Sequence, residues 1–169
     1  MKNLKSHLFA GFIIGSIMIL LNVIFIIFNL EGNTKITWIS SVVNMAMLIY
    51  FIYDYGRNND NTKAFGELFS YGFKATALVT IILTMFMIAY SYIFPESESK
   101  AMEIAREKML QDERMTDDMI EQALDVTRKF YFPILIAGTI FATMVVGAVG
   151  SLIGAAITRK TETTPFGKS

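Results

Sequence analysis

Four long stretches of this chain carry no Asp, Glu, Lys or Arg, and they constrain the fold more than any other feature. About 20 apolar residues in a helix that rises 1.5 Å per residue cross the roughly 30 Å of hydrocarbon in a bilayer. The clearest case runs from Phe73 to Phe94, with no charge after Lys74. The sequence therefore predicts four membrane spans, at about residues 8–30, 36–55, 73–94 and 133–157.

The polar segments between these spans predict how the chain is connected. A short turn at residues 31–35 makes the first two spans an antiparallel hairpin. Residues 96–130 are the one substantial charged element, and their apolar residues recur at helical spacing. With 53% hydrophobic and 18% charged residues, the chain is more hydrophobic and less charged than an ordinary globular protein. We expect an all-α fold: an integral membrane four-helix bundle, with an extramembrane amphipathic helical insert between spans 3 and 4, forming a single membrane domain over residues 1–169.

Small residues predict where the spans pack closely. The first span carries a Gly-x-x-x-Gly pair and is expected to be retained as a signal anchor, because no small-residue cleavage site follows it. The pair itself is also compatible with the ordinary frequency of glycine in membrane helices. The last span repeats small residues every three or four positions, which gives the strongest case for close helix contact in the chain. The predicted packing residues are Gly11, Gly15, Gly147, Gly150, Ser151 and Gly154.

Polar side chains inside the spans form a second group of predicted packing residues. Asn22 and Asn44 lie at similar depth on either side of the first turn. Since an unpaired amide in hydrocarbon is costly, we expect both to face the bundle interior and bond each other, as helix contacts rather than substrate ligands. Thr76, Thr80 and Thr84 share one face of the third span. A polar stripe can line a pore, but with no charged partner at that depth it favours packing.

The insert offers a candidate surface for a partner. Two amphipathic helices are expected, the second with Thr116 as its N-cap. A stripe of Met102, Met109, Met119 and Leu124 could receive apolar side chains of another protein, or seat the insert's helices on each other or on the membrane. Its acidic cluster lacks EF-hand spacing, so a solvated charged face is the better interpretation than a cation site.

The sequence gives little support for catalysis or for cofactor binding. The chain has no cysteine and a single histidine, His7, at a membrane edge. No His-Glu-x-x-His or Gly-x-Ser-x-Gly pattern is present. We therefore expect no enzyme activity, no cofactor and no metal, with a lipid-acting membrane enzyme as the remaining alternative. Lys plus Arg equals Asp plus Glu at 15 each, so nothing in the charge indicates a nucleic-acid partner.

Basic residues near the span ends set the expected orientation. With the N-terminus inside, the cytoplasmic side holds Lys2, Lys5, Arg57, Lys63, Lys74, Arg159, Lys160 and Lys168. Most basic residues of the insert lie within its helices, where they count less toward orientation. We expect both termini in the cytoplasm and residues 96–130 outside it, in a cell inner membrane.

The order of several weak motifs resembles a known family. A Phe-Gly-x-x-Phe-x-x-Gly stretch begins at Phe65, a Tyr-x-x-Pro pattern at Tyr92 ends the third span, and the Gly-rich last span is followed by Arg159 and Lys160. Together with the Met-rich insert, these features resemble the bacterial membrane proteins grouped as domain-of-unknown-function family 4199. In members of this family the second loop often has Arg-Asp followed by paired glycines. This chain has Tyr55-Gly-Arg57-Asn-Asn-Asp60 in that loop, so the feature is only partly present. The resemblance implies four spans in a bacterial inner membrane and supplies neither an activity nor catalytic residues.

Two functional hypotheses of different class remain. The first is a structural, accessory or protein-interaction component of the membrane, with a membrane or extracytoplasmic protein partner or a second copy of itself. The alternative is a small transporter or channel that acts as an oligomer. No Asp, Glu, Lys, Arg or His lies at mid-membrane depth, where ion pathways usually carry one, and this favours the first hypothesis.

Overall fold

The computed structural model describes residues 6–30, 33–112 and 114–158, and these residues form six helices without a strand. The bounds are α1 His7–Ile27, α2 Thr34–Asn58, α3 Phe65–Ile93, α4 Glu96–Leu110, α5 Asp117–Lys129 and α6 Tyr131–Ile157. Four of them, α1, α2, α3 and α6, are long and apolar enough to cross a membrane. The predicted all-α membrane fold is confirmed. Lys2, Lys5, Arg159, Lys160 and Lys168, on which the predicted orientation partly rests, lie outside the described residues.

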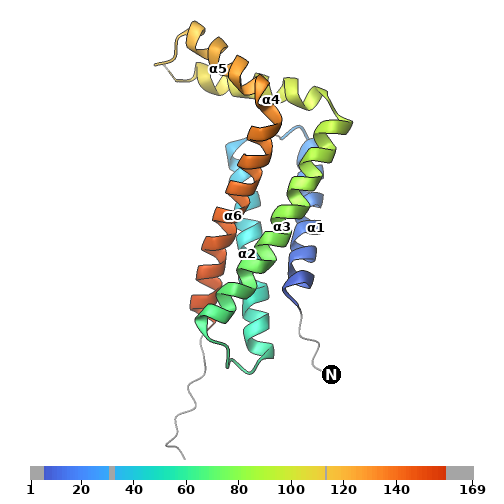
Figure 1. The fold of residues 1–169 in the computed structure, drawn as a ribbon, viewed down its shortest axis with the longest axis vertical. Helices are drawn as coiled ribbons and strands as arrows, with labels where there is room; N and C mark the ends of the chain where they lie inside the picture. Colours follow the sequence, from blue (N-terminus) through green and yellow to red (C-terminus); the bar gives the residue numbers. More distant parts are fainter. Residues whose placement is uncertain (1–5, 31–32, 113, 159–169) are drawn as a thin grey trace, which may run out of the picture.

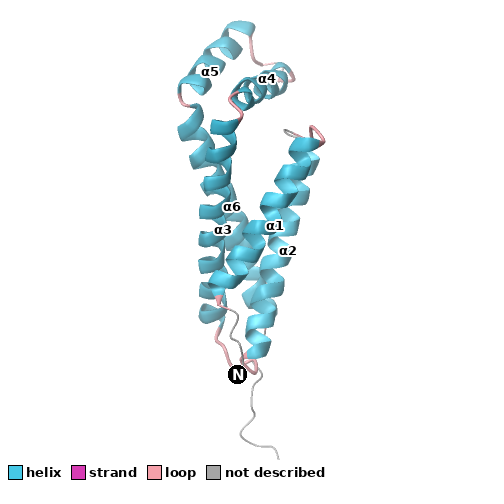
Figure 2. Cartoon of the chain, turned by 90° about the vertical axis from the view of Figure 1, so that its right-hand side faces the viewer, coloured by secondary structure: helices cyan, strands magenta, loops and turns pink. Residues whose placement is uncertain are grey.

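The four long helices form an elongated bundle with the insert at one end (Figure 1). α3 packs against α6 and α1, and α2 packs mainly against α6. The two described ends of the spanning region, at the start of α1 and the end of α6, lie opposite the insert (Figure 1). Seen from the side, the pair α1 and α2 diverges from the pair α3 and α6 toward the insert (Figure 2). The bundle is therefore tight at one end and open at the other.

The third helix begins earlier than the predicted span. The sequence predicts the third span from about Phe73, whereas α3 is continuous from Phe65. A carboxylate explains the early start: Glu67 Oε2 accepts a hydrogen bond from the backbone N–H of Ala64 at 3.1 Å, and Glu67 Oε1 pairs with Lys63 Nζ at 2.9 Å. The hydrogen bond satisfies a backbone N–H at the start of the helix. The negative charge of the carboxylate also complements the positive end of the helix dipole.

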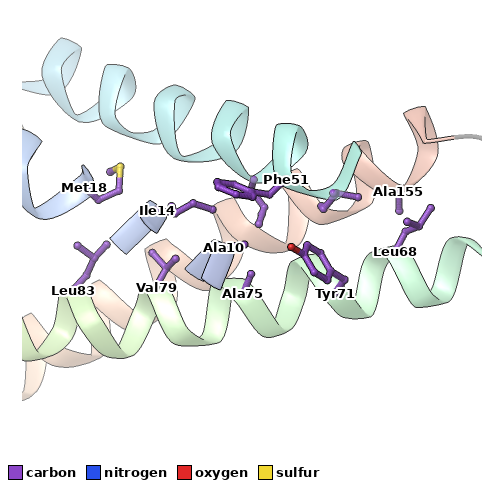
Figure 3. Packing of buried hydrophobic residues seen from close by; sticks show 12 residues of the cluster. Ala10, Ile14, Met18, Phe51, Leu68, Tyr71, Ala75, Val79, Leu83 and Ala155 are labelled. Atoms are coloured by element: carbon purple, nitrogen blue, oxygen red, sulfur yellow. The ribbon is translucent and has the colours of Figure 1, made fainter. Parts of the chain in front are cut away.

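The hydrophobic core fills the tight half of the bundle. Figure 3 shows side chains of α1, α2, α3 and α6 meeting there, among them Ile14, Phe51, Val79 and Ala155. Ile14 and Ile52 are completely buried, and Val79 is 2% exposed. No other part of the described chain brings so many buried side chains of all four spans together. This half of the bundle is sealed by packed apolar side chains.

Glycines allow the backbones to approach in this half. A Cβ added to Gly11 would lie 2.8 Å from the backbone oxygen of Ala75, and one added to Gly147 would overlap the side chain of Thr76. A Cβ added to Gly15 would lie 2.9 Å from the Cδ1 atom of Ile82. Small residues thus join α3 to both α1 and α6.

The insert is a helical hairpin that lies across the open end of the bundle (Figures 1 and 2). Thr116 is the N-cap of α5, as the sequence predicts, and its Oγ1 accepts from the backbone N–H of Met119 at 3.4 Å. Met102 and Ile120 are buried between α4 and α5, and Arg106 pairs with Glu121 at 3.1 Å across them. The hairpin has its own small core.

Candidate functional site

A cleft lies where the two helix pairs diverge. Its deepest part is a cavity of about 280 Å³ to which all four spans contribute. A second cavity of about 280 Å³ continues toward the insert between α1, α2 and α3, and shares Asn22, Thr37, Ser40 and Met87 with the first. We call these two cavities the insert-side cleft. They are lined by Met18, Asn22, Phe25, Ile26, Leu30, Ile36, Thr37, Ser40, Ser41, Asn44, Leu83, Phe86, Met87, Tyr90, Thr139, Ala142, Thr143 and Val146.

The insert covers the upper end of the cleft. A cavity of about 250 Å³ beneath α4 shares Met87 and Tyr90 with the insert-side cleft, and a further cavity of about 500 Å³ extends outward beside it. Lys100 of α4 lines both of these outer cavities, and its Nζ donates a hydrogen bond to Oδ1 of Asn29 at 3.0 Å. The cleft thus leads from the bundle interior to the charged surface of the insert.

The insert-side cleft is polar but uncharged. Amide and hydroxyl groups from α1, α2 and α6 line it, and none of its lining residues is Asp, Glu, Lys, Arg or His. α2 contributes the largest share, because Thr37, Ser40, Ser41 and Asn44 recur on one face of the helix. The site can bind hydrogen-bonding groups, but it has no charge with which to neutralise an ion.

Four of the polar side chains are satisfied by their own helices. Asn22 Nδ2 donates to the carbonyl of Met18 at 2.8 Å, and Thr139 Oγ1 donates to the carbonyl of Leu135 at 2.8 Å. Thr37 and Ser41 bond the carbonyls four residues before them in the same way, at 3.3 and 3.0 Å. Such bonds within one helix are a usual solution for polar groups in an apolar environment.

Three other side chains of the cleft have no such partner. Asn44 is 7% exposed and Thr143 is 8% exposed, and neither makes a hydrogen bond to any residue that the structure describes. The same is true of the half-buried Ser40. The polar atoms of these three side chains are accessible from the cavity rather than enclosed by other protein atoms. The deepest part of the cleft therefore presents unmet donors and acceptors.

The two asparagines singled out from the sequence lie on the walls of the same cleft. The structure has no hydrogen bond between Asn22 and Asn44, and the Asn22 amide donates one N–H to the carbonyl of Met18 on its own helix. Their similar depth follows from the hairpin, as the sequence suggests.

The other predicted packing residues are distributed over the helix contacts. Thr76 and Thr80 donate to the carbonyls of Gly72 and Thr76 at 3.0 and 2.9 Å, while the buried Oγ1 of Thr84 has no partner in the described chain. Close helix approach involves the predicted glycines Gly11 and Gly15 on α1 and Gly147, Gly150 and Gly154 on α6. Ser151 is fully buried between them and lies near Gly72 of α3.

The four residues of the predicted partner face do not share one surface. Met102 is 7% exposed inside the hairpin, Met109 and Leu124 are half-buried, and Met119 is 51% exposed. The fold of α4 on α5 uses the inner part of the stripe for its own packing. Met119 instead belongs to an exposed apolar row with Val126 on α5 and Phe130 at the C-cap of that helix.

Ser40 and Thr143 were not identified from the sequence as site residues. A signal for Ser40 exists in the spacing of Thr37, Ser40, Ser41 and Asn44, which places four polar groups on one face of α2. Thr143 lies four residues after Thr139, so the two threonines share one face of α6. Its position opposite the polar face of α2 shows that it lines the cleft.

Charged groups with shifted pKa values lie away from the cleft. On the turn between α4 and α5, hydrogen bonds from Arg114 lower the pKa of Asp112. Before α3, the hydrogen bond to Glu67 raises the pKa of Lys63. Within the described ranges, no group of three His, Cys, Asp or Glu residues is placed to hold a metal ion.

Comparison with known proteins identifies the family. Residues 10–160 match the family described as "Protein of unknown function (DUF4199)". No curated protein and no solved structure matches the chain. Since the match covers most of the sequence, the chain belongs to this family of proteins of unknown function.

Proposed function

We propose that this member of the DUF4199 family is an accessory component of a bacterial inner membrane that binds another protein through its insert. The observation that carries this proposal is the exposed apolar row on α5. Met119 and Val126 are 51% and 55% exposed on α5, although the opposite face of this helix is already buried against α4, and Phe130 at the C-cap of α5 is 54% exposed. An apolar row outside the spans is typical of an interaction surface.

The charge of the insert favours a protein over the bilayer as the partner. Residues 96–129 contain ten acidic and six basic residues. Helices that lie in a membrane interface usually carry Lys and Arg on their polar face, and anionic lipids repel an acidic one. The partner that fits is an apolar surface with a basic rim, on an extracytoplasmic protein or on the exposed part of another membrane protein.

This assignment includes an orientation. Both termini are placed in the cytoplasm and the insert outside, on the balance of basic residues described above. The spans themselves serve as an anchor in the bilayer, and no catalytic role is proposed. A lipid-acting enzyme is the weaker alternative, because no nucleophile and base are paired in the described chain.

The insert-side cleft keeps a small transporter as a second candidate. A cleft that reaches into the bundle from one side is the kind of feature on which transport depends. Two observations weigh against it: the cleft has no charged residue, and the packed core around Ile14 and Val79 fills the bundle beyond it. A transporter would have to open that core or act through an oligomer.

Site-directed crosslinking tests the proposed interaction. Because the chain has no cysteine, Met119→Cys gives a unique attachment point for a photoreactive probe on the exposed row. In membranes of the native cell we expect one protein adduct of defined mass. Adding Phe130→Asp to the same chain should abolish the adduct, since a carboxylate would be buried in the apolar contact.

Met102→Cys is the matched control, because it lies on the same insert but inside the hairpin. It should give no protein adduct. If Met119→Cys labels only lipid, or gives an adduct that Phe130→Asp leaves unchanged, the proposal is wrong. A product that contains two copies of the chain would replace the accessory role with self-association.

A further inference from the structure

We propose that the insert-side cleft is a binding site for an uncharged amphiphile from the bilayer, whose hydroxyl or carbonyl group is held by Asn44. This inference is independent of any partner of the insert. It rests on the polar groups at the base of the cleft, the apolar walls around them, the absence of charge and the shape of the opening.

The unmet hydrogen bonds define the polar end of the ligand. The amide of Asn44 offers two donors and an acceptor, and the hydroxyls of Ser40 and Thr143 offer both. None of the three is satisfied by a described residue, although Asn44 and Thr143 are more than nine-tenths buried. The polar atoms of all three are accessible from the cavity, so a ligand group that accepts, and also donates where it is a hydroxyl or amide, can form hydrogen bonds with them.

The walls define the body of the ligand. Met18, Leu83 and Met87 line the deep cavity, and Phe25 and Ile26 line the one above it. Methionine side chains adapt to irregular apolar shapes, and a mostly apolar cavity with a few polar groups is the usual form of a small-molecule site. A hydrocarbon chain or an apolar ring fits these walls.

The absence of charge excludes ionic head groups from the deep cavity. A carboxylate or phosphate placed beside Asn44 would meet no Lys, Arg or His of the lining. Burial of an unpaired ion in such an environment costs several kcal/mol. The ligand at this depth is neutral.

The geometry also decides between a small molecule and a helix of another protein. The cavities of about 280 Å³ lie between diverging helix pairs (Figure 2). A helix with its side chains is about 10–12 Å across and needs far more room. A lipid-sized molecule that enters from the insert-side leaflet is the occupant that fits.

Photolabelling of the reconstituted full chain tests the inference. The probes are dodecanol, dodecanoic acid and dodecane, each with a diazirine at the far end of the chain, in phosphatidylcholine vesicles at pH 7. We expect dodecanol to label the cleft walls saturably and to be displaced by unlabelled dodecanol. The acid and the alkane should show no displaceable labelling there.

Two threonines on α6 supply a matched pair of variants. Thr143 and Thr139 both line the cleft, but only Thr139 is bonded to its own helix. Thr143→Val should reduce displaceable dodecanol labelling about fivefold, the effect of one net hydrogen bond. Thr139→Val should leave it unchanged. Asn44→Leu should reduce it at least as much as Thr143→Val does.

Two results would overturn the inference. Equal labelling by all three probes, unaffected by Thr143→Val, would mean that ordinary lipid chains fill an apolar slot. Rapid modification of Asn44→Cys by a water-soluble thiol reagent, without displaceable labelling, would mean that water occupies the cleft. Because Thr143→Val keeps the size and shape of the side chain, the test does not depend on whether Asn44→Leu folds.

Discussion

Lys100 of the insert donates a hydrogen bond from Nζ to Oδ1 of Asn29, 3.0 Å away, across 71 positions of the chain. Asn29 adopts a left-handed backbone with φ of 53° in the turn after α1, where asparagine is among the best-tolerated residues. The contact joins α4 to the helix pair that diverges from α3 and α6. We call this hydrogen bond between Lys100 and Asn29 the tie, because it connects the insert to the end of α1 across the open end of the bundle.

Removing this tie should loosen α4 without unfolding the bundle. We expect Asn29→Gly, which keeps the left-handed backbone but removes the acceptor, to speed amide hydrogen exchange in the first turns of α4. The thermal midpoint should change little, because a single hydrogen bond contributes about 0.5–1.5 kcal/mol and this one is exposed.

Lys100→Met should speed exchange in α4 at least as much as Asn29→Gly, because Lys100 also makes a further interaction. Lys108→Met is the control, since Lys108 lies on the same helix without a charged or hydrogen-bonded partner in the described chain. Identical exchange in all three variants and the parent would show that the tie does not hold the insert.

Gly147 should be intolerant of a methyl group. A Cβ at this position would overlap the side chain of Thr76 on α3, and overpacking of this kind costs about 1–3 kcal/mol. Gly147→Ala should therefore lower the free energy of unfolding by that amount, measured by denaturation in mixed micelles.

Gly138 is the control on the same helix. No atom lies within 4 Å of a Cβ added there, so Gly138→Ala should be neutral or stabilise the chain by up to about 1 kcal/mol through helix propensity. Equal losses for the two variants would indicate a general intolerance of α6 rather than a contact with α3.

Replacement by alanine should destabilise the hairpin at Ile120 but have little effect at Met119. Ile120 is 2% exposed between α4 and α5, and Ile→Ala at a buried position costs about 2–5 kcal/mol. Ile120→Ala should thus release the protection of α5 amides from hydrogen exchange. Met119→Ala should change it by less than about 0.5 kcal/mol, because the side chain lies outside the hairpin core. A protected α5 in Ile120→Ala would mean that α5 is held elsewhere.

The turn between α4 and α5 should respond to acid in a defined range. Arg114 donates hydrogen bonds to both carboxylate oxygens of Asp112, at 2.9 and 2.8 Å, and lowers its pKa. Because the folded-state pKa is depressed, the contribution of this pair is present above the ordinary Asp pKa and is lost as pH falls through the lower folded value.

Carbon-13 NMR titration of the carboxyl group measures this shift. Arg114→Gln should raise the pKa of Asp112 toward the ordinary value, whereas Arg106→Gln, which removes the pair with Glu121, should not. An unchanged Asp112 pKa in Arg114→Gln would show that the hydrogen bonds do not form in solution.

The spans were predictable because each rests on a local property. A charge-free window as long as residues 8–30 has few alternatives to a membrane helix. The glycine pairs at Gly11 and Gly147 likewise mark helix faces that need close approach. The early start of α3 was missed because it depends on one carboxylate, Glu67, that caps the backbone at Ala64.

The polar cleft could be predicted only in part. Counting residues from the turn places Asn22 and Asn44 at similar depth, but it could not show that Asn22 bonds its own helix or that the two amides do not bond each other. Thr143 became recognisable only when α6 was placed opposite α2. Helix periodicity places a residue on a face, but the partner of that face comes from tertiary packing.

The divergence of the two helix pairs toward the insert gives the molecule a wedge-shaped outline (Figure 2). The four long helices lie closer together at the end where α1 begins and farther apart at the end that carries the insert. Lipids in the two leaflets therefore surround perimeters of different length. In a bilayer this outline would displace more area in one leaflet than in the other, which would couple insertion to the lateral pressure and curvature of the membrane.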